Sequence, residues 1–498
     1  MKPLILKEYD KIIRDTLLDK ETIYVTNSNG TVSLCAEYFD ALKNILLKRG
    51  NQEEGKEELR GSIVNFLKLA NHRQHGEILQ IQHYVGIIEL SNGFQIEALP
   101  KIDIKESLNK EQETAALEQI LLRMLGYLKD FPAIPSDTAN IDTRRTSLYE
   151  VFIQLYLGKV ERLIRHGLRY QYVSIEENLP SFKGRLNVTK QLRYNGAKKQ
   201  YFYITHDEYL LDSPENRLIK STLLYLSDKS ENNANSKLAR KLLEAFENVP
   251  DSTDFLGDYG RISYDRFNDF YHDVIEWSIV FLLGKSFVIS QGSTVVDSLF
   301  FPMEKIFEAF IGKQLTKCLR DNQKEFPKWK LKTQSTKKFL FDDPKKFQIK
   351  PDIRIYRGSG LSEENIIFDT KWKKLDPSGR SRNYGISTAD MYQMYAYAKR
   401  YKANDVWLLY PDSRGEESIK TRKYKTTTDL YEESLKWNDQ HQEIKLDANV
   451  TVHLEFIDLS VLSEANYLTA MKHIETELKS LLERSINTGS PNNEKPSS

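Results

Sequence analysis

The chain has 498 residues, of which 40% are hydrophobic, 29% are charged and 11% are aromatic. This composition excludes a largely disordered protein, and the length suffices for about two to four domains. A formal net charge of +1 neither favours nor excludes a nucleic-acid partner. Only two cysteines occur, Cys35 and Cys318, which excludes a disulfide framework and a Cys-x-x-Cys zinc site.

Targeting signals are not evident in the sequence. No run approaches the ~20 consecutive apolar residues that a membrane helix requires. The first residues, MKPLILKEYDKIIRD, carry charges where a signal peptide would be apolar. We therefore expect a cytoplasmic protein without a membrane partner.

The N-terminal region, residues 1–105, is expected to be rich in β-structure and is a candidate for contact with a partner protein. Apolar and polar residues alternate over Ile78–Ile87, turn-forming residues follow at 91–93, and a second apolar run extends over Phe94–Leu99. This order predicts a β-hairpin.

The middle region, residues 106–295, is expected to be mainly helical. Apolar residues recur at helical spacing from Leu117 to Leu128 and from Leu148 to Ile164. A polar stretch, Asn178–Lys199, separates these helices from others expected at 214–228, 234–247 and 263–283. The run Ile279–Ser286 ends like a phosphate-binding loop but lacks its first glycine, so we expect no GTP binding by this chain.

The third region, residues 296–460, is predicted to form a compact α/β domain. The pattern indicates a helix at 303–320, strands at 329–334, 347–356 and 364–372, a helix at 387–402 and a strand at 404–410. A last helix at about 463–484 occupies the segment 461–485. The tail, residues 486–498, has nothing apolar to bury and is expected to be disordered. Taken together, the fold class predicted is multidomain α+β.

Positive charge is concentrated in the third region. Residues 313–382 contain 19 Lys or Arg against 9 Asp or Glu, a local excess of 10. The rest of the chain therefore carries 53 basic and 62 acidic residues, a net charge of −9. A local positive field favours contact with phosphates, although a lysine-rich face is often simply solvated.

The polar residues of the predicted strands suggest a reaction centre. In FQIKPDIRIY, the isoleucines alternate with polar residues, so Asp352 is expected on the polar face of a strand, while Pro351 suggests a strand edge or start. In the following strand, Asp369 and Lys371 are two residues apart and should share one face. Two carboxylates and an ammonium group would then lie together.

Phosphodiester hydrolysis needs these groups: oxygen ligands for a hard cation, an activated water and nearby positive charge. Asp352 and Asp369 would hold Mg²⁺, and Lys371 would orient the water or favour its hydroxide form. A further acid is expected on the preceding helix, where Glu304 and Glu308 lie one turn apart. Glu308 is favoured because it borders the apolar side of this helix, but the choice stays open.

The helix after the second of these strands adds a supporting pair. Gln393 and Tyr397 form a Q-x-x-x-Y pattern whose side chains can hold a phosphate or a catalytic carboxylate. Each element alone has an ordinary explanation: a Pro-Asp turn, a surface ion pair or tyrosines in a core. Their order along one α/β unit predicts a nuclease.

This arrangement resembles the PD-(D/E)xK nuclease superfamily, with the Gln393 and Tyr397 pair similar to its RecB-type branch. Further segments resemble the McrC family: YVGIIEL and IEALPKI near the N-terminus, Gly184-Arg185-Leu186, the run from Asp212 to Arg217, MEKIFEAF, and DMYQMYAYAKRYKANDVWLLYP. Together these segments span most of the chain.

The resemblance implies the Mg²⁺-dependent endonuclease subunit of a 5-methylcytosine-dependent McrBC restriction system that acts on methylated double-stranded DNA in phage defence. Such a subunit works with a GTP-hydrolysing AAA+ hexamer of the McrB type and stimulates its hydrolysis by inserting an arm into the ring. GTP would be bound by that partner. The alternatives are a non-catalytic DNA-binding or activator subunit and a stand-alone repair nuclease.

Overall fold

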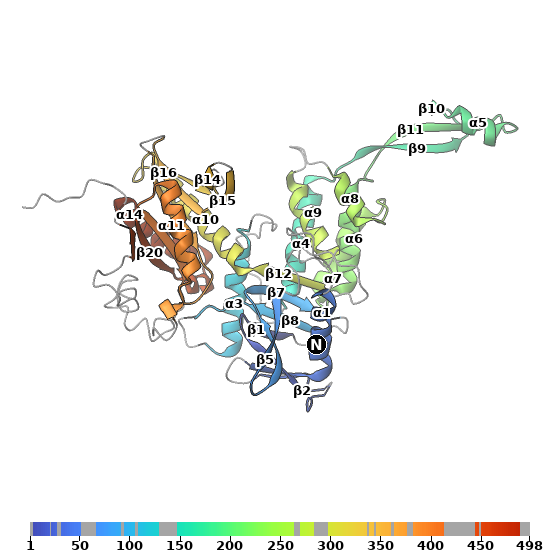
Figure 1. The fold of residues 1–498 in the computed structure, drawn as a ribbon. Helices are drawn as coiled ribbons and strands as arrows, with labels where there is room; N and C mark the ends of the chain where they lie inside the picture. Colours follow the sequence, from blue (N-terminus) through green and yellow to red (C-terminus); the bar gives the residue numbers. More distant parts are fainter. Residues whose placement is uncertain are drawn as a thin grey trace, which may run out of the picture. The chain divides into compact units, whose positions relative to one another are not determined.

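The structure is a computed structural model that divides into two compact units (Figure 1). Unit 1 comprises Met1–Arg145 and Phe300–Ser498, and unit 2 comprises Thr146–Leu299. The residues described are 3–19, 21–26, 31–50, 66–90, 94–104, 108–128, 147–262, 269–282, 297–335, 338–342, 345–359, 363–375, 382–412, 444–447 and 450–488. Unit 2 is thus an insertion in the sequence of unit 1.

Two sheets form the N-terminal part of unit 1. The first has the order β3-β4-β2-β6-β5, made of Tyr24–Thr26, Thr31–Cys35, Lys11–Asp15, Gly76–Ile81 and Leu67–His72. The second has the order β1-β8-β7-β12, made of Leu4–Lys7, Gln95–Leu99, Tyr84–Glu89 and Asp297–Pro302. Helices α1 (Ala36–Gly50) and α3 (Lys110–Leu125) complete this part. Asn109 caps α3 in a reciprocal capping box with Gln112.

The predicted hairpin is present but shorter at its start. Strands β7 and β8 are antiparallel, with Ile88 opposite Ile96. The run Ile78–Ile87 is divided between β6, which ends at Ile81 in one sheet, and β7, which begins at Tyr84 in the other. β7 is buried on both faces and β6 only in part, so the alternation over Ile78–Ile87 does not correspond to one strand with a single buried face.

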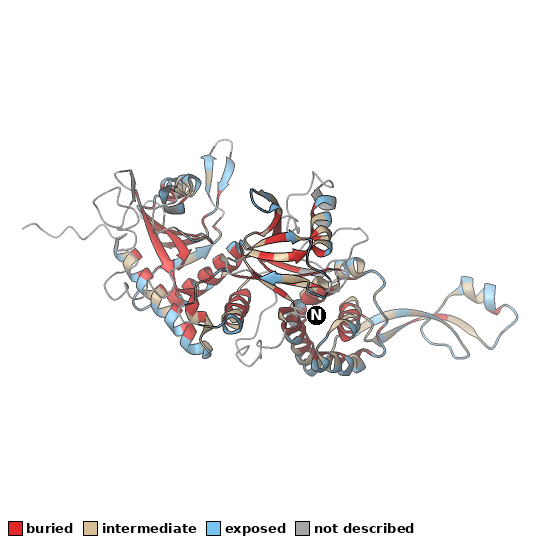
Figure 2. Ribbon diagram, turned by 90° about the horizontal axis from the view of Figure 1, so that it is seen from below, coloured by how far each residue is buried: buried red, intermediate tan, exposed pale blue. Residues whose placement is uncertain are grey.

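The C-terminal part of unit 1 is a mixed six-stranded sheet with helices. Its order is β13-β16-β17-β18-β20-β19, made of Lys330–Thr333, Ile353–Arg357, Glu364–Thr370, Asp405–Pro411, Val450–Ile457 and Ile444–Asp447. β17 pairs in parallel with β18, and β18 with β20, while the remaining pairs are antiparallel. The helices are α10 (Met303–Asp321), α11 (Thr388–Tyr401) and α14 (Tyr467–Thr488), with short turns η5 (Arg382–Gly385) and η6 (Leu459–Ser463). The central strands are buried (Figure 2).

One expected strand is in fact two. The segment expected as a single strand at 347–356 is interrupted at residues 350–352. Before the break, β15 (Lys345–Ile349) pairs only with β14 (Lys338–Asp342) in a two-stranded hairpin, and after it β16 joins the main sheet. Pro351 has no N–H to donate to a ladder, which accounts for the break.

Unit 2 contains the predicted helices together with a sheet that was not predicted. Helices α4 (Leu148–His166), α6 (Pro214–Lys229), α7 (Asn233–Leu243), α8 (Phe255–Arg261) and α9 (Asp269–Leu282) occur with the turn η3 (Glu244–Phe246). Strands β9 (Gln171–Leu179), β10 (Arg185–Leu186) and β11 (Phe202–Leu210), with helix α5 (Val188–Asn195), form a sheet ordered β10-β11-β9 that extends away from these helices (Figure 1). The polar stretch Asn178–Lys199 does separate α4 from α6, and it contains the end of β9, β10 and α5.

Some expectations fall on residues outside those described. These are the turn at 91–93, the first residues of the helix expected at 263–283, the end of the run Ile279–Ser286 and residues 489–498 of the tail. Residues 486–488, expected in the tail, are the last turn of α14. Among the described helices, none has the length and hydropathy needed to cross a membrane. The fold is mixed α/β with more than one unit, while its assignment as a PD-(D/E)xK domain stays a prediction.

Candidate active site

Asp352 lies directly before β16 rather than on the polar face of a strand. Its Oδ2 accepts hydrogen bonds from the backbone N–H of Thr370 at 2.8 Å and from the Thr370 hydroxyl at 2.7 Å. Since Thr370 ends β17, these bonds join the start of one strand to the end of its neighbour. Asp352 is therefore held beside Asp369, as the sequence predicts.

Asp369 and Lys371 meet although only the first lies within the strand. Asp369 belongs to β17, is 1% exposed and is paired with Leu408 of β18. Lys371 follows the strand end, and its backbone N–H donates to the carbonyl of Leu409 at 2.8 Å. Its Nζ lies 2.5 Å from Oδ2 of Asp369. This backbone bond to β18 thus holds the chain in place just past the end of β17. It keeps the Lys371 ammonium beside the Asp369 carboxylate.

Of the two candidate upstream acids, Glu308 is the one that the fold places near Asp352 and Asp369. Glu308 is partly buried on α10, and its Oε1 accepts a hydrogen bond from the side-chain amide of Gln334. The backbone N–H of Gln334 donates to the carbonyl of Asp352 at 2.8 Å, so Gln334 links both acids. Glu304, the alternative, is exposed one turn earlier.

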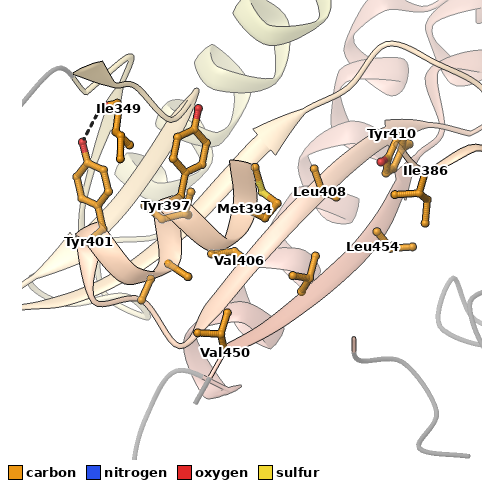
Figure 3. Packing of buried hydrophobic residues seen from close by; sticks show 14 of the residues in the cluster. Ile349, Ile386, Met394, Tyr397, Tyr401, Val406, Leu408, Tyr410, Val450 and Leu454 are labelled. Atoms are coloured by element: carbon orange, nitrogen blue, oxygen red, sulfur yellow. Dashed lines mark hydrogen bonds between the residues drawn. The ribbon is translucent and has the colours of Figure 1, made fainter. Parts of the chain in front are cut away.

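Helix α11 contributes a chain of hydrogen bonds that ends at the lysine. Lys371 Nζ donates to Oε1 of Gln393 at 2.9 Å, and the Gln393 amide donates to the hydroxyl of Tyr397 at 2.7 Å. Tyr397 in turn donates to the backbone carbonyl of Lys350 at 3.0 Å. Tyr397 lies on the face of α11 that packs onto the sheet (Figure 3). The predicted Q-x-x-x-Y pair therefore connects Lys371 to the segment before Asp352.

The electrostatics of the site follow from burying several acids together. Burial, with the nearby charges of Asp352 and Asp369, raises the pKa of Glu308 to about 8. Burial and the charge of Asp352 raise the pKa of Asp369 to about 7. Burial also raises the pKa of Asp352. Burial alone would lower the pKa of Lys371, but the adjacent carboxylates, Asp369 first, outweigh it and raise that pKa.

The acids offer suitable donors for magnesium. Carboxylate oxygens are the ligands that this hard cation prefers, and their mutual repulsion would be relieved by a divalent charge. Among the described residues, the buried Oδ2 of Asp369 has no partner other than the Lys371 ammonium, 2.5 Å away. In the described ranges, no group of three His, Cys, Asp or Glu side chains is arranged as a metal-binding cluster. Magnesium usually takes one or two carboxylates and keeps several waters, so the donor set fits it.

Sequence reasoning did not find every residue that holds the site. Thr370 and Gln334 orient Asp352 and Glu308 through the bonds described above. Thr370 stands between two predicted residues, so its place in the Asp-Thr-Lys triplet was a usable signal. Gln334 directly follows β13 and has a positive φ of 49°, and no local sequence pattern identifies it.

Comparisons with known proteins identify the family. The family model described as McrBC 5-methylcytosine restriction system component matches residues 79–411, which is more than half of the chain. No curated protein matches the chain.

Two chains of solved structures are similar to this one. The first comes from a half-complex of the tetradecameric assembly of Thermococcus gammatolerans McrB AAA+ hexamers with bound McrC. It has 17% sequence identity and a TM-score of 0.65, over 96% of this chain and 100% of that chain. The second comes from the Thermococcus gammatolerans McrBC complex, with 19% identity and a TM-score of 0.44 over 64% of this chain and 88% of that chain. The first likeness shows a shared fold over nearly the whole length.

The family match covers Glu308, Asp352, Asp369 and Lys371, as well as α11. The chain belongs to the family of McrBC 5-methylcytosine restriction system components.

Proposed function

We propose that this chain is the DNA-cleaving subunit of a McrBC-type restriction system, with a PD-(D/E)xK site that hydrolyses phosphodiester bonds. The observation that carries the proposal is the meeting of Asp352, Asp369, Lys371 and Glu308, contributed by three elements of one α/β unit. A buried cluster of carboxylates with one ammonium group is not expected to stabilise the fold, because removing charges from water costs free energy. Such clusters are typical of reaction centres.

Asp352 and Asp369 would hold Mg²⁺, with Glu308 as a third acid. When bound, the cation would polarise the phosphate and lower the pKa of the attacking water. Lys371 would act as a fixed positive charge beside the developing negative charge of the phosphate. Its raised pKa supports this role over that of a general base. Gln393 accepts from Lys371 and donates to Tyr397, and so restricts the ammonium group to one direction.

The partner would be a GTP-hydrolysing AAA+ hexamer of the McrB type, and the substrate methylated double-stranded DNA. We assign the arm implied by the resemblance to the sheet β9-β10-β11 with α5. β9 and β11 pair over nine positions, and β9 is alternately exposed and half-buried, with no fully buried face (Figure 2). Large apolar side chains are exposed on it, including Tyr172 at 75% and Leu192 at 74%. Surfaces of this kind commonly bind other proteins.

The nuclease assignment is tested with Asp369→Ala in the full chain, mixed with the AAA+ partner, GTP, Mg²⁺ and methylated plasmid. We expect the wild-type chain to cut and EDTA to stop the cutting. The variant should lose at least about a thousandfold in rate while it still assembles and stimulates GTP hydrolysis. A fully active variant would contradict the assignment. A wild-type chain that never cuts would indicate a non-catalytic activator instead, and cutting by the chain alone would indicate a stand-alone nuclease.

The arm is tested separately with Tyr172→Ser and Leu192→Ser. We expect GTP hydrolysis by the partner to lose its stimulation, because the apolar contact is removed. The exposed positions predict unchanged folding of the chain itself. Unaltered stimulation of GTP hydrolysis by the double variant would refute the assignment of the arm. It would leave the nuclease assignment unaffected.

A further inference from the structure

The hairpin β14–β15 carries exposed apolar side chains next to the candidate active site. Leu340, Phe341 and Phe347 are 42%, 53% and 70% exposed. The hairpin forms its own two-stranded sheet, separate from the six-stranded one. Exposing three large apolar residues on so small an element costs free energy in water, which points to a binding role.

Lysines surround these apolar residues. Lys338, Lys345 and Lys346 belong to the hairpin and are exposed, and Lys350 follows it immediately before Pro351. The sequence from 337 to 350 contains five lysines and two aspartates, a local charge of +3. This sign suits a polyanion, whereas a purely apolar protein partner would not require it.

The two phenylalanine rings form a single apolar unit. In a regular antiparallel ladder, Phe341 shares its face with its partner Lys346, and Phe347 would project to the other face. The backbone of Phe347 instead has a positive φ of 58°, which departs from this alternation. The two rings lie 5.9 Å apart in an edge-to-face arrangement. The strained backbone therefore accompanies a paired aromatic surface.

Hydrogen bonds fix the base of the hairpin to the active site. The hydroxyl of Tyr401 donates to the carbonyl of Ser335 at 3.1 Å on one side of the hairpin. It also reaches the carbonyl of Ile349 at 3.5 Å on the other side (Figure 3). Tyr397 donates to the carbonyl of Lys350, two residues before Asp352. A ligand held by the hairpin would therefore be held at a fixed distance from the reacting phosphate.

We propose that the hairpin β14–β15 is a DNA-binding element that holds the duplex beside the cleavage site. Lys345 and Lys346 contact backbone phosphates, and the Phe341 and Phe347 rings pack against bases exposed in a groove or at an opened base step. This inference rests on the proposed nuclease function, because it takes DNA as the substrate of the adjacent acids. It adds a substrate-binding surface outside the catalytic residues.

The test measures DNA affinity of the full chain in an Asp369→Ala background, by fluorescence anisotropy on a labelled duplex at several salt concentrations. For Lys345→Gln with Lys346→Gln, we expect weaker binding and a salt dependence reduced by about two phosphate contacts. The matched control is Lys237→Gln with Lys241→Gln on α7, which removes two exposed lysines elsewhere and should leave both quantities unchanged.

The aromatic pair is tested with Phe341→Ser and Phe347→Ser on a duplex containing 2-aminopurine near the cut site. We expect the unsubstituted hairpin to increase the 2-aminopurine fluorescence by unstacking the base, and the double variant to lose this increase and bind about tenfold more weakly. A Phe347→Trp variant should retain the signal. Unchanged affinity, salt dependence and fluorescence would overturn the inference, as would a loss of AAA+ partner binding with normal DNA affinity.

The outcomes distinguish a failure of the hairpin inference from a failure of the nuclease assignment. If the wild-type chain cuts DNA with its partner but the hairpin variants bind DNA normally, the hairpin inference is wrong and the nuclease remains. If the variants lose DNA binding but no chain ever cuts, the hairpin inference holds and the nuclease assignment is wrong.

Discussion

The buried carboxylate of Glu8 accepts hydrogen bonds from the indole N–H of Trp372, with both oxygens at 3.0 Å, across 364 positions of the sequence. Glu8 follows β1, and its Oε2 also accepts from the backbone N–H of Lys101 at 3.1 Å. Trp372 is the neighbour of Lys371, and its ring lies 5.5 Å from that of Phe307 on α10. The N-terminal part of unit 1 thus supports the segment that carries the candidate catalytic lysine.

Replacing Trp372 with Phe should destabilise unit 1 by about 1 to 3 kcal/mol, because Glu8 loses a donor while it stays buried. Urea unfolding of the full chain measures the change. Trp407→Phe is the control, since this tryptophan is equally buried but its indole N–H has no hydrogen-bond partner in the described part of the chain. An equal loss of unfolding free energy in the two variants would show that the hydrogen bond from Trp372 to Glu8 does not stabilise the fold.

Glu8 should also make stability depend on pH. Burial raises the pKa of Glu8 to about 7 from an ordinary value of 4.5. Between these values the folded chain keeps a proton that the unfolded chain has lost, so stability falls as pH rises from about 4.5 to about 7 and then levels off. Over this range the free energy of unfolding falls by about 3 kcal/mol because of Glu8.

Glu8→Gln should flatten this part of the pH dependence, because the amide does not titrate. The measurement is the urea midpoint at several values between pH 5 and pH 8. Glu111→Gln, at an exposed position of α3, provides the control and should leave the slope unchanged. A Glu8→Gln slope identical to that of the wild type would contradict the raised pKa.

The two possible upstream acids can be separated by matched substitutions. Glu308→Gln should reduce DNA cleavage by about a hundredfold or more, since it removes a carboxyl group that could bind the cation beside Asp352 and Asp369. Glu304→Gln, one turn away and exposed, should retain near-normal activity. The initial cleavage rate with saturating partner decides between them, and the reverse order of effects would exchange their roles.

Tyr397→Phe tests the chain of bonds that ends at Lys371. The variant keeps the ring in its core position but leaves the carbonyl of Lys350 and the amide of Gln393 without this partner. We expect about a tenfold lower kcat with little change in KM, because the orientation of the lysine is affected and not DNA binding. A changed KM with normal kcat would instead place Tyr397 in substrate binding.

Local patterns could predict the helices and the order of the α/β elements. The helices have one apolar face, and the central strands β17 and β18, which are buried on both faces, have short apolar runs. Local patterns could also predict that Asp369 and Lys371 meet, since residues two apart in an extended segment share a face, although Lys371 lies just past the end of β17. They could not predict the break before β16, because the alternation of Ile349 and Ile353 continues through Pro351 although the two strands pair with different neighbours.

Other features lay beyond local patterns for different physical reasons. The sheet β9-β10-β11 buries no complete face, so its sequence lacks the apolar alternation that identifies a strand. The bonds of Gln334 to Glu308 and of Glu8 to Trp372 join residues distant in the sequence, and only the tertiary fold determines them. The candidate site was recognisable from its acids and lysine, whereas the residues that orient them were largely not.

Unit 2 interrupts the sequence of unit 1, and this affects the order in which unit 1 can fold during synthesis. A ribosome completes β1, β7 and β8 first, but the fourth strand of their sheet, β12, emerges only after all of unit 2 has been made. Until then the outer edge of β7 offers unpaired backbone groups. Asp352, Asp369 and Lys371 are translated later still, so a nascent chain cannot carry an assembled site while most of it is still being made. Under the proposed function, an unfinished chain therefore has no assembled site with which to cut DNA.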